Sequence, residues 1–534
     1  MQLDESRRLT GPNLYAAAPG AIAEVVFEGG DDPAHAVALW REELGRALAA
    51  LGWPADDVHV RHYRGGAALF FVAPLDALMP ATEVNEWAVA SAAARLAGGA
   101  PAPLPTIDLA PRPQLPRLAA AARARGVPLL IDDDEVTLGA GARLVRYPAT
   151  APLPAPDDVP WARLGTVPVA LVTGTNGKTT TTRLVARMAQ LAGRRPGLSS
   201  SDGVVVDGRY VERGDWSGPD AARRVLRHPD VDVAILETAR GGILRRGLAV
   251  ERCDAALITN VSVDHLGGYG VDDLATMARV KAVVARGAGT VIVNADDAAL
   301  AALTFDAPVV RFSAAGAAGA AWRVVDGWIV HDGRPVIAVA DVPLTFAGRA
   351  RYNLENALAA AALATALGVP ATAVVEGLRT FTSSARDNPG RGNVVERDGV
   401  QIVVDFGHNP AAVRGVIALA RGLAPGRLFV SLGMAGDRPD DELAEVAREV
   451  AAGRPHRVLI RELADYLRGR APGEVPARLV DDLIAAGVAA AAIAIAPDEL
   501  ATVRDALALA RPGDVVVILC HLDAAVEAFL TPSG

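Results

Sequence analysis

The chain has 534 residues, and because a single hydrophobic core rarely grows that large, this length predicts three or four domains. Half of the residues are hydrophobic (51%) and 22% are charged, which excludes intrinsic disorder. The formal net charge is -9 and no cluster of Lys and Arg stands out, which excludes the basic surface of a nucleic-acid or membrane-surface binder.

The N-terminal part is predicted to be a small α+β domain. Residues 21–27 and 67–72 are typical of strands, and residues 33–51 and 84–96 are typical of helices. Five prolines between Tyr147 and Trp161 oppose a helix and favour an extended, exposed connector. We therefore expect a first domain over residues 1–147 and a proline-rich linker over 148–160.

The central part shows the pattern of a doubly wound α/β domain. Short apolar runs, each followed by a turn and a helical stretch, are typical of buried parallel strands. A weaker, strand-rich interval over 309–346 is predicted to be a small β insertion, and a helix over 353–367 follows it. We expect this domain to span residues 161–388. The four apolar runs are residues 167–172, 231–237, 255–259 and 290–294.

A third α/β unit begins after the turn signal Asn388-Pro389-Gly390. Its apolar runs again alternate with helical segments, which predicts a second open, Rossmann-like sheet over residues 389–534. The predicted strands are 401–405, 427–433, 457–461 and 514–519.

A phosphate-binding loop follows the first strand of the central domain. Residues 173–180 read TGTNGKTT: the glycines let backbone N–H groups close around phosphate oxygens, and the following helix offers its positive N-terminus. The segment departs from the standard P-loop because Val172 occupies the place of the first glycine. The residues expected to bind ATP here are Gly174, Thr175, Asn176, Gly177, Lys178, Thr179 and Thr180.

Lysine is rare in this chain. Lys178 and Lys281 are the only two lysines among 53 basic residues. A base-composition bias toward arginine explains the shortage, but a lysine kept against that bias suggests chemistry that a guanidinium cannot perform, because an amine can lose its proton and become a nucleophile. Lys178 lies in the phosphate loop, and Lys281 lies on a predicted helix.

Two further polar groups follow buried strands. Glu237 ends the strand predicted over 231–237, where a carboxylate is costly unless it is paired or binds a metal ion. His265 closes a segment that follows the strand predicted over 255–259. Ligands of open α/β sheets bind outside the carboxyl ends of the strands, so we expect Glu237, His265 and the phosphate loop to share one site.

In these motifs the chain resembles the Mur ligases, a family of ATP-dependent amide-forming enzymes. The resemblance covers about residues 161–534. Within the family the likeness is to the Mur-like module of cyanophycin synthetase, and the N-terminal part resembles that enzyme too, but the ATP-grasp domain between the two parts is missing here. The matching segments are GTNGKT at 174–179, Asn260 to His265 (N-x-x-x-D-H), Lys281 at the place of the family's carbamylated lysine, YNLENA at 352–357, Gly390-Arg391, and Asp405 to Pro410 (D-x-x-H-N-P).

The resemblance implies a ligase that converts a carboxylate to an acyl phosphate with ATP and then passes the acyl group to an amine. It implies two Mg²⁺ sites, one at Thr179 and Glu237, the other at His265 and a CO₂-derived carbamate on Lys281. The expected catalytic residues are Lys178, Glu237, His265 and Lys281. The expected further ATP contacts are Asn353 and Asn356 around adenine, Arg391 on the phosphates and Asp405 on the ribose.

Candidate substrate residues flank glycines or strand ends. Arg240 suits a carboxylate because a guanidinium pairs with it in a bidentate manner. The expected substrates are an amino acid and an acidic amino acid or peptide, with no nucleic-acid or membrane partner. The sequence does not decide which acid and amine are joined, or whether the protein forms a homo-oligomer. The candidates are Asp202, Thr238, Arg240, His408, Asn409 and Arg468.

Two functional readings stay open. The first is the ligase, in a cytoplasmic protein, since two cysteines cannot form a disulfide framework and no apolar run is long enough to span a bilayer. The second is a non-catalytic protein that has kept the Mur ligase fold and binds ATP or a polymer. A P-loop ATPase coupled to movement is disfavoured because a Walker B pair and an arginine finger are not recognisable.

Overall fold

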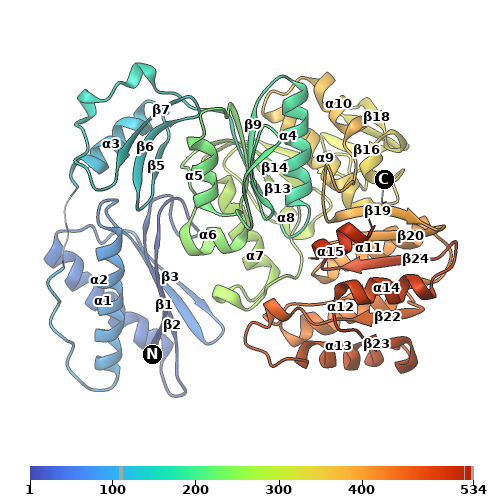
Figure 1. Ribbon diagram of the computed structural model, residues 1–534. Coiled ribbons are helices and arrows are strands. Elements are labelled where there is room, and N and C mark those ends of the chain that lie inside the picture. Colours follow the sequence, from blue (N-terminus) through green and yellow to red (C-terminus); the bar gives the residue numbers. More distant parts are fainter. Residues whose placement is uncertain (108–111, 522, 531–534) are drawn as a thin grey trace.

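The computed structural model describes residues 1–107, 112–521 and 523–530, which form three adjoining units (Figure 1). The N-terminal unit, blue to cyan in Figure 1, contains two antiparallel sheets with the strand orders β1-β2-β4-β3 and β5-β6-β7. Helices α1 and α2 pack on the first sheet around the buried Trp40. The predicted small α+β unit is confirmed. Its elements are β1 (Gln2–Leu9), β2 (Gly20–Val26), α1 (Pro33–Leu51), β3 (Val58–Tyr63), β4 (Gly66–Val72), α2 (Leu78–Leu96), α3 (Gln114–Ala124), β5 (Leu129–Ile131), β6 (Glu135–Ala140) and β7 (Arg143–Pro148).

The proline-rich segment over residues 148–160 is partly exposed and partly packed: Pro148, Pro152 and Pro160 are exposed, whereas Val159 is buried. Val159 and Leu164 are buried against α3 and β6, and the Trp161 indole N–H donates to the carbonyl of Pro156 at 2.7 Å. Two short 3₁₀ helices, Pro156–Asp158 and Trp161–Arg163, lie in and just after this segment, because a proline is tolerated in the first turn of a helix. The apolar residues between the prolines pack on the N-terminal unit. The residue boundaries of the three units stay a prediction.

The central unit is one twisted sheet in the order β11-β10-β9-β12-β8-β13-β14-β15-β16-β17-β18. The neighbouring strands β9, β12, β8, β13, β14, β15 and β16 run parallel to one another. Helices α4, α9 and α10 pack on one face of the sheet, and α5, α6 and α7 pack on the other. Its elements are β8 (Val169–Thr173), α4 (Lys178–Leu191), β9 (Pro196–Ser200), β10 (Gly203–Val206), β11 (Arg209–Arg213), α5 (Pro219–Arg227), β12 (Val233–Glu237), α6 (Arg240–Arg246), β13 (Cys253–Ile258), α7 (Leu274–Lys281), β14 (Ala288–Asn294), α8 (Ala298–Ala301), β15 (Val309–Ser313), β16 (Trp322–Val325), β17 (Trp328–His331), β18 (Arg334–Ala338), α9 (Arg351–Ala366) and α10 (Ala371–Thr380).

The predicted doubly wound α/β domain is confirmed, but the interval 309–346 is not a separate insertion. Strand β15 pairs in parallel with β14, with Val309 beside Val291, and β16 to β18 continue the sheet to its edge. Phe312 and Trp322 pack into the same core as α9. Strands β15 to β18 therefore extend the main sheet instead of forming a core of their own.

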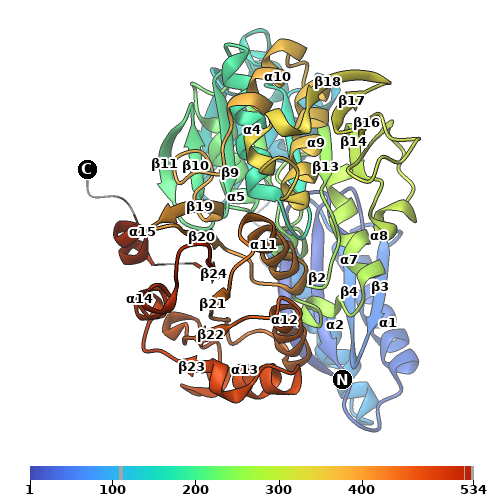
Figure 2. The same cartoon turned by 90° about the vertical axis from the view of Figure 1, so that its right-hand side faces the viewer.

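The C-terminal unit, orange to red in Figure 1, has the sheet order β19-β20-β24-β21-β22-β23, parallel except for β19. Helices cover both faces, which confirms the expected Rossmann-like architecture. In Figure 2 this unit lies below the central sheet, with α11 turned toward it. Its elements are β19 (Arg391–Arg397), β20 (Val400–Asp405), α11 (Pro410–Leu423), β21 (Leu428–Leu432), α12 (Asp440–Ala452), β22 (Arg457–Ile460), α13 (Glu474–Ala485), β23 (Ile493–Ile495), α14 (Glu499–Leu509), β24 (Val515–Leu519) and α15 (Ala524–Leu530).

Within the residues described, no helix combines the length and the apolar character needed to cross a membrane.

Candidate active site

A cavity of about 1290 Å³ lies where the three units meet, at the carboxyl ends of the central strands. The strands β12, β8, β13 and β14 are neighbours in the sheet, so the segments that follow them converge at one edge. The N-terminal strand β1 and the segment 405–412 of the C-terminal unit complete the wall. The three units thus share one chamber.

The phosphate loop lies on this wall between β8 and α4. Gly174 (φ +149°) and Gly177 (φ +84°) take backbone conformations that favour glycine, and a Cβ on Gly177 would lie 2.0 Å from Oδ1 of Asn356. Asn260 accepts hydrogen bonds from the backbone N–H groups of Thr175 and Asn176, both at 2.9 Å. The segment that follows β13 therefore supports the loop from behind.

The side chain of Lys178 folds over the loop that carries it. Its Nζ donates to the carbonyl oxygens of Gly174 (3.2 Å) and Thr175 (3.0 Å). The positive N-terminus of α4 and this ammonium therefore lie together, an arrangement suited to the terminal phosphates of a nucleotide.

Thr179 and Glu237 meet beside the loop. The Thr179 hydroxyl donates to Oε2 of Glu237 at 2.9 Å and lies 3.3 Å from Oγ of Ser201. Burial raises the pKa of the Glu237 carboxyl, although Lys178 and the Thr179 hydrogen bond oppose this shift. A hydroxyl and a carboxylate that converge beside a phosphate loop are oxygen donors of the kind that Mg²⁺ prefers.

Lys281 ends α7 and opens on the same cavity. Its side chain is buried, and no hydrogen-bond partner for it occurs among the residues that the structure describes. Burial, reinforced by the positive charge of Lys178, lowers the pKa of the amine to about 7. His265 lines the cavity as well, and burial lowers its pKa to about 4, which leaves a neutral imidazole. Both groups are thus able to offer a lone pair near neutral pH.

Asp264 connects the central unit to the C-terminal unit. Its Oδ1 lies 2.5 Å from Nη1 of Arg438 and 3.9 Å from Nε2 of His408, and Arg438 also binds Glu442 at 2.7 Å. Burial opposes ionisation of Asp264, yet His408 and Arg438 hold its pKa well below the usual range. Sequence reasoning did not single out Asp264 or Arg438, although Asp264 belongs to the N-x-x-x-D-H motif.

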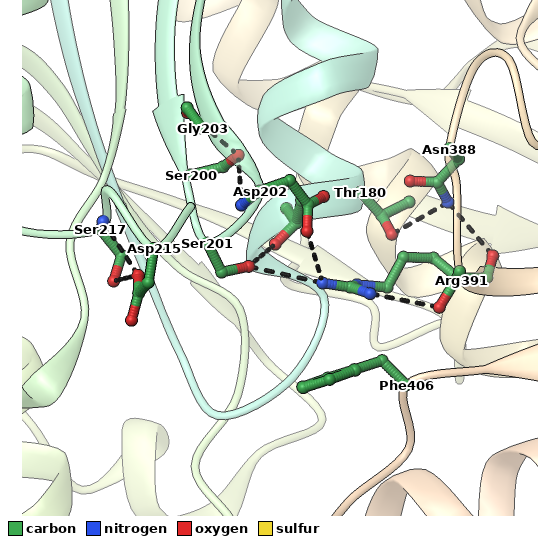
Figure 3. Close-up of polar contacts among 12 residues, drawn as sticks. Thr180, Ser200, Ser201, Asp202, Gly203, Asp215, Ser217, Asn388, Arg391 and Phe406 are labelled. Atoms are coloured by element: carbon green, nitrogen blue, oxygen red, sulfur yellow. Dashed lines mark hydrogen bonds and ion pairs between the residues drawn. The ribbon is translucent and has the colours of Figure 1, made fainter. Parts of the chain in front are cut away.

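Arg391 makes a second connection between these units (Figure 3). Its Nη2 lies 3.3 Å from Oδ1 of Asp202 and 3.4 Å from Oγ of Ser201, and its guanidinium lies over the Phe406 ring at 4.8 Å. Asp202 also binds Arg183 at 2.9 Å. Asp202 is therefore engaged with two arginines and does not line the cavity.

The remaining predicted residues divide between the cavity and its surroundings. Asn353 donates to the carbonyl of Leu344, Thr238 donates to that of Leu236, and the amide of Asn409 binds that of Asn176 at 2.9 Å. These three, like Asp202, lie outside the cavity wall. The predicted residues that line the cavity are Gly174, Thr175, Asn176, Gly177, Lys178, Thr179, Thr180, Glu237, Arg240, His265, Lys281, Asn356, Arg391, Asp405, His408 and Arg468.

Several wall residues gave no signal in the sequence. Glu5 and Arg7 come from β1, a charged edge strand that sequence reasoning missed altogether. Tyr269 follows His265 in a loop that the N-terminal unit holds, since Arg61 donates to the carbonyls of Tyr269 (2.7 Å) and Gly270 (2.5 Å). Only the contact between units brings these residues to the site.

Comparison with known proteins gives consistent matches. Residues 172–364 match the Mur ligase middle domain, and residues 390–521 match the Mur ligase, glutamate ligase domain. A cyanophycin synthetase of Synechocystis is 36% identical over 376 residues, which are 66% of this chain and 42% of that protein. The chain thus spans less than half the length of the cyanophycin synthetases that it matches.

Two further relatives extend the comparison. A crystal structure of the bifunctional folylpolyglutamate synthase/dihydrofolate synthase of Yersinia pestis, with AMPPNP and Mn ion, shares the fold with a TM-score of 0.52 at 22% identity, over 68% of this chain and 88% of that one. The UDP-N-acetylmuramoyl-L-alanyl-D-glutamate–2,6-diaminopimelate ligase of Alkalilimnicola ehrlichii is 31% identical over 444 residues, or 79% of this chain and 82% of that enzyme. The relatives are named ligases or synthetases, which agrees with the enzyme class expected from the motifs. The chain belongs to the Mur ligase family.

Proposed function

We propose that this protein is an ATP-dependent carboxylate–amine ligase that joins an amino acid to an acidic amino acid or peptide through an acyl phosphate. The observation that carries the proposal is the shared cavity, into which the phosphate loop, the Thr179–Glu237 pair and the buried amine of Lys281 all open. The names of the relatives, cyanophycin synthetase and Mur ligases among them, support the same reaction class.

ATP binds at the phosphate loop in this proposal. The glycine-rich backbone and Lys178 hold the β- and γ-phosphates, and Asn356, which lies against Gly177, contacts the nucleotide from α9. Arg391 and Asp405 line the cavity from the C-terminal unit, and in this proposal Arg391 binds the phosphates and Asp405 the ribose. Burial raises the pKa of Asp405 to about 6, although Arg391 opposes this shift.

The donor set suits two divalent cations. Thr179 and Glu237 would hold one Mg²⁺, an ion that binds through few protein ligands. The neutral imidazole of His265 and a carbamate on Lys281 would hold the other. A bound Mg²⁺ supplies positive charge that reduces the repulsion between the nucleotide and the acid substrate.

Lys281 fits a carbamate for a physical reason. CO₂ reacts with a neutral amine, and a pKa of about 7 leaves a large share of Lys281 neutral at physiological pH. The product is an anion with two oxygen atoms, which suits a hard cation, and arginine has no corresponding reaction. This accounts for the second lysine of a chain that otherwise uses arginine.

The chemistry then has two steps. A carboxylate oxygen of the acid attacks the γ-phosphorus, the bond to the bridging oxygen breaks, and ADP leaves. The amine nitrogen attacks the acyl carbon, phosphate leaves, and the amine loses its proton as the amide forms. Lys178 stabilises the charge of the transferring phosphoryl group. Arg240, His408 and Arg468 line the part of the cavity available to the acid and the amine.

Phosphate release tests the proposal. The protein is incubated with MgATP and pairs of acids and amines, with aspartyl and glutamyl peptides as acids and arginine, lysine and other amino acids as amines. The expected result is release of ADP and phosphate that requires both members of one pair, with a product heavier by the amine less water. If ATP binds but no pair raises phosphate release, the protein is the non-catalytic nucleotide binder instead.

A further inference from the structure

The turn between β9 and β10 carries a carboxylate that two arginines share. Oδ2 of Asp202 accepts a hydrogen bond from Nη2 of Arg183 on α4 at 2.9 Å, and Oδ1 lies 3.3 Å from Nη2 of Arg391, the first residue of β19. Arg391 lines the central cavity, whereas Asp202 does not. Asp202 is therefore placed to act on a ligand in the cavity through Arg391 and not by direct contact.

The Asp202 carboxylate is itself held in place. The backbone N–H of Asp202 donates to Oγ of Ser200 at 3.2 Å, which fixes the turn. The Nη2 group of Arg183 that binds Asp202 also donates to the Tyr210 hydroxyl at 2.8 Å. The Arg183 side chain is only 10% exposed, so α4 and β11 both restrain it. The turn thus offers Oδ1 of Asp202 to the C-terminal unit in a defined position.

The guanidinium of Arg391 is confined on several sides (Figure 3). It lies over the Phe406 ring at 4.8 Å, its Nη1 donates to the carbonyl of Gly390 at 3.2 Å, and its Nη2 lies 3.4 Å from Oγ of Ser201. Within the part of the chain that the structure describes, Asp202 is the one carboxylate within ion-pair distance of Arg391. Nε and one N–H of Nη1 keep no partner among the described residues, so they are available to an anion.

These contacts reach the phosphate loop. The Ser201 hydroxyl that Arg391 approaches lies 3.3 Å from Oγ1 of Thr179. Asn388, which is fully buried and precedes Arg391 by three residues, donates from Nδ2 to Oγ1 of Thr180 at 3.2 Å (Figure 3). The segment that enters the C-terminal unit is therefore docked on the first turn of α4, with Arg391 beside the loop. A side chain that is already ordered loses less entropy when it binds a ligand.

We infer that Asp202 is a positioning residue for Arg391: it holds the guanidinium where the phosphates of the nucleotide bind. The inference rests on the proposed function, from which it takes the binding of phosphates by Arg391. The opposite role for the same contact is competition, in which Asp202 holds Arg391 away from the phosphates. The two roles predict opposite changes in what Arg391 contributes to nucleotide affinity when Asp202 is replaced.

A double-mutant cycle on the full chain measures that contribution. The affinity for AMPPNP with Mg²⁺ is determined by calorimetry for Arg391→Ala, in the wild-type background and in the Asp202→Asn background. Loss of a hydrogen-bonded charge should weaken binding about 10- to 100-fold in the wild-type background. In the Asp202→Asn background this loss should be about 3- to 10-fold smaller, because the freed arginine must be ordered on binding. Direct repulsion between Asp202 and the phosphates cancels in the comparison, since it is the same with and without Arg391.

Glu212→Gln is the matched control background. Glu212 on β11 is paired with Arg224, its side chain is 29% exposed against 25% for Asp202, and it lies outside the cavity wall. The change removes one carboxylate from an arginine pair and keeps the size of the side chain, as Asp202→Asn does. The loss caused by Arg391→Ala should therefore be the same in the Glu212→Gln background as in the wild type.

Four results would overturn the inference. Arg391→Ala without any loss of affinity would show that this arginine does not bind the nucleotide. An equal loss in the wild-type and Asp202→Asn backgrounds would show that Asp202 does not position it. A larger loss in the Asp202→Asn background would establish competition instead, and a smaller loss in Glu212→Gln as well would indicate a general effect of charge. Failure of the ligase proposal is seen separately, as absent phosphate release with every acid and amine pair while the cycle still shows the coupling.

Discussion

Gly177 allows a sharp test of how the phosphate loop is built. It caps the N-terminus of α4 at φ +84°, and a Cβ there would lie 2.0 Å from Oδ1 of Asn356. In Gly177→Ala the left-handed backbone costs about 1–2 kcal/mol. Displacing Asn356 also breaks its 3.1 Å hydrogen bond to Asn353, which costs about 1 kcal/mol more.

A second glycine separates the two costs. Gly193 has φ +77° and nothing within 4 Å of an added Cβ, so Gly193→Ala should show the backbone cost alone. We expect Gly177→Ala to lower the free energy of unfolding by about 2–3 kcal/mol, against about 1–2 kcal/mol for Gly193→Ala. The affinity for ATP should fall at least about tenfold in Gly177→Ala, because the same shift distorts the phosphate loop, and should stay unchanged in Gly193→Ala.

Thermal unfolding and titration with a fluorescent ATP analogue measure both quantities. Asn356→Ala completes a double-mutant cycle with Gly177→Ala, since removing the amide relieves the clash but not the backbone strain. The close approach of α9 to the loop would be refuted by a coupling free energy below about 0.5 kcal/mol between Gly177→Ala and Asn356→Ala, together with equal losses of unfolding free energy in Gly177→Ala and Gly193→Ala.

Three further predictions concern the site. Lys281→Arg should keep the thermal stability and the nucleotide affinity but abolish phosphate release, because a guanidinium cannot form a carbamate; turnover in this variant would remove the carbamate from the proposal. Arg438→Ala leaves the buried Asp264 without its partner at 2.5 Å. We therefore expect the C-terminal unit to move away from the central unit, seen by small-angle scattering, and phosphate release to slow. Arg448→Ala, which changes an exposed residue of α12, is the control. Asp405→Asn should stabilise the unliganded protein at pH 8 by up to about 3 kcal/mol, because burial raises the pKa of this carboxyl to about 6.

The sign of the last effect follows from linkage. A carboxyl whose pKa is higher in the folded than in the unfolded state binds its proton more tightly when folded, so it destabilises the protein most above pH 6 and not at all well below pH 4. The unfolding midpoints of Asp405→Asn and the wild type should therefore differ at pH 8 and converge toward pH 4. A difference between the two unfolding midpoints that grows as the pH falls would contradict a buried Asp405 carboxyl with a raised pKa.

The sequence by itself determined the architecture of the central and C-terminal units. Apolar runs at 231–237 and 401–405 overlap β12 and β20 closely, because strands of a parallel sheet are buried on both faces and leave a continuous apolar signature. The phosphate loop, Glu237 and His265 follow local rules of the same kind: a glycine pattern, or a polar group placed after a strand. Each of these signals lies within a few residues of the group that it identifies. Lys281 was indicated by the rarity of lysine and by the resemblance to the Mur ligases.

Tertiary structure alone decided which residues face one another. Strand β1 is charged and lies at an edge, so nothing in its pattern indicates that Glu5 and Arg7 form part of the cavity. Asp202 follows a strand as an acceptor residue would, yet it binds Arg391, which lies 189 positions away and in another unit. Ion pairs between units depend on how separate cores dock, and docking leaves no periodicity in the chain. The sequence could therefore indicate candidate catalytic groups but not the charges that surround them.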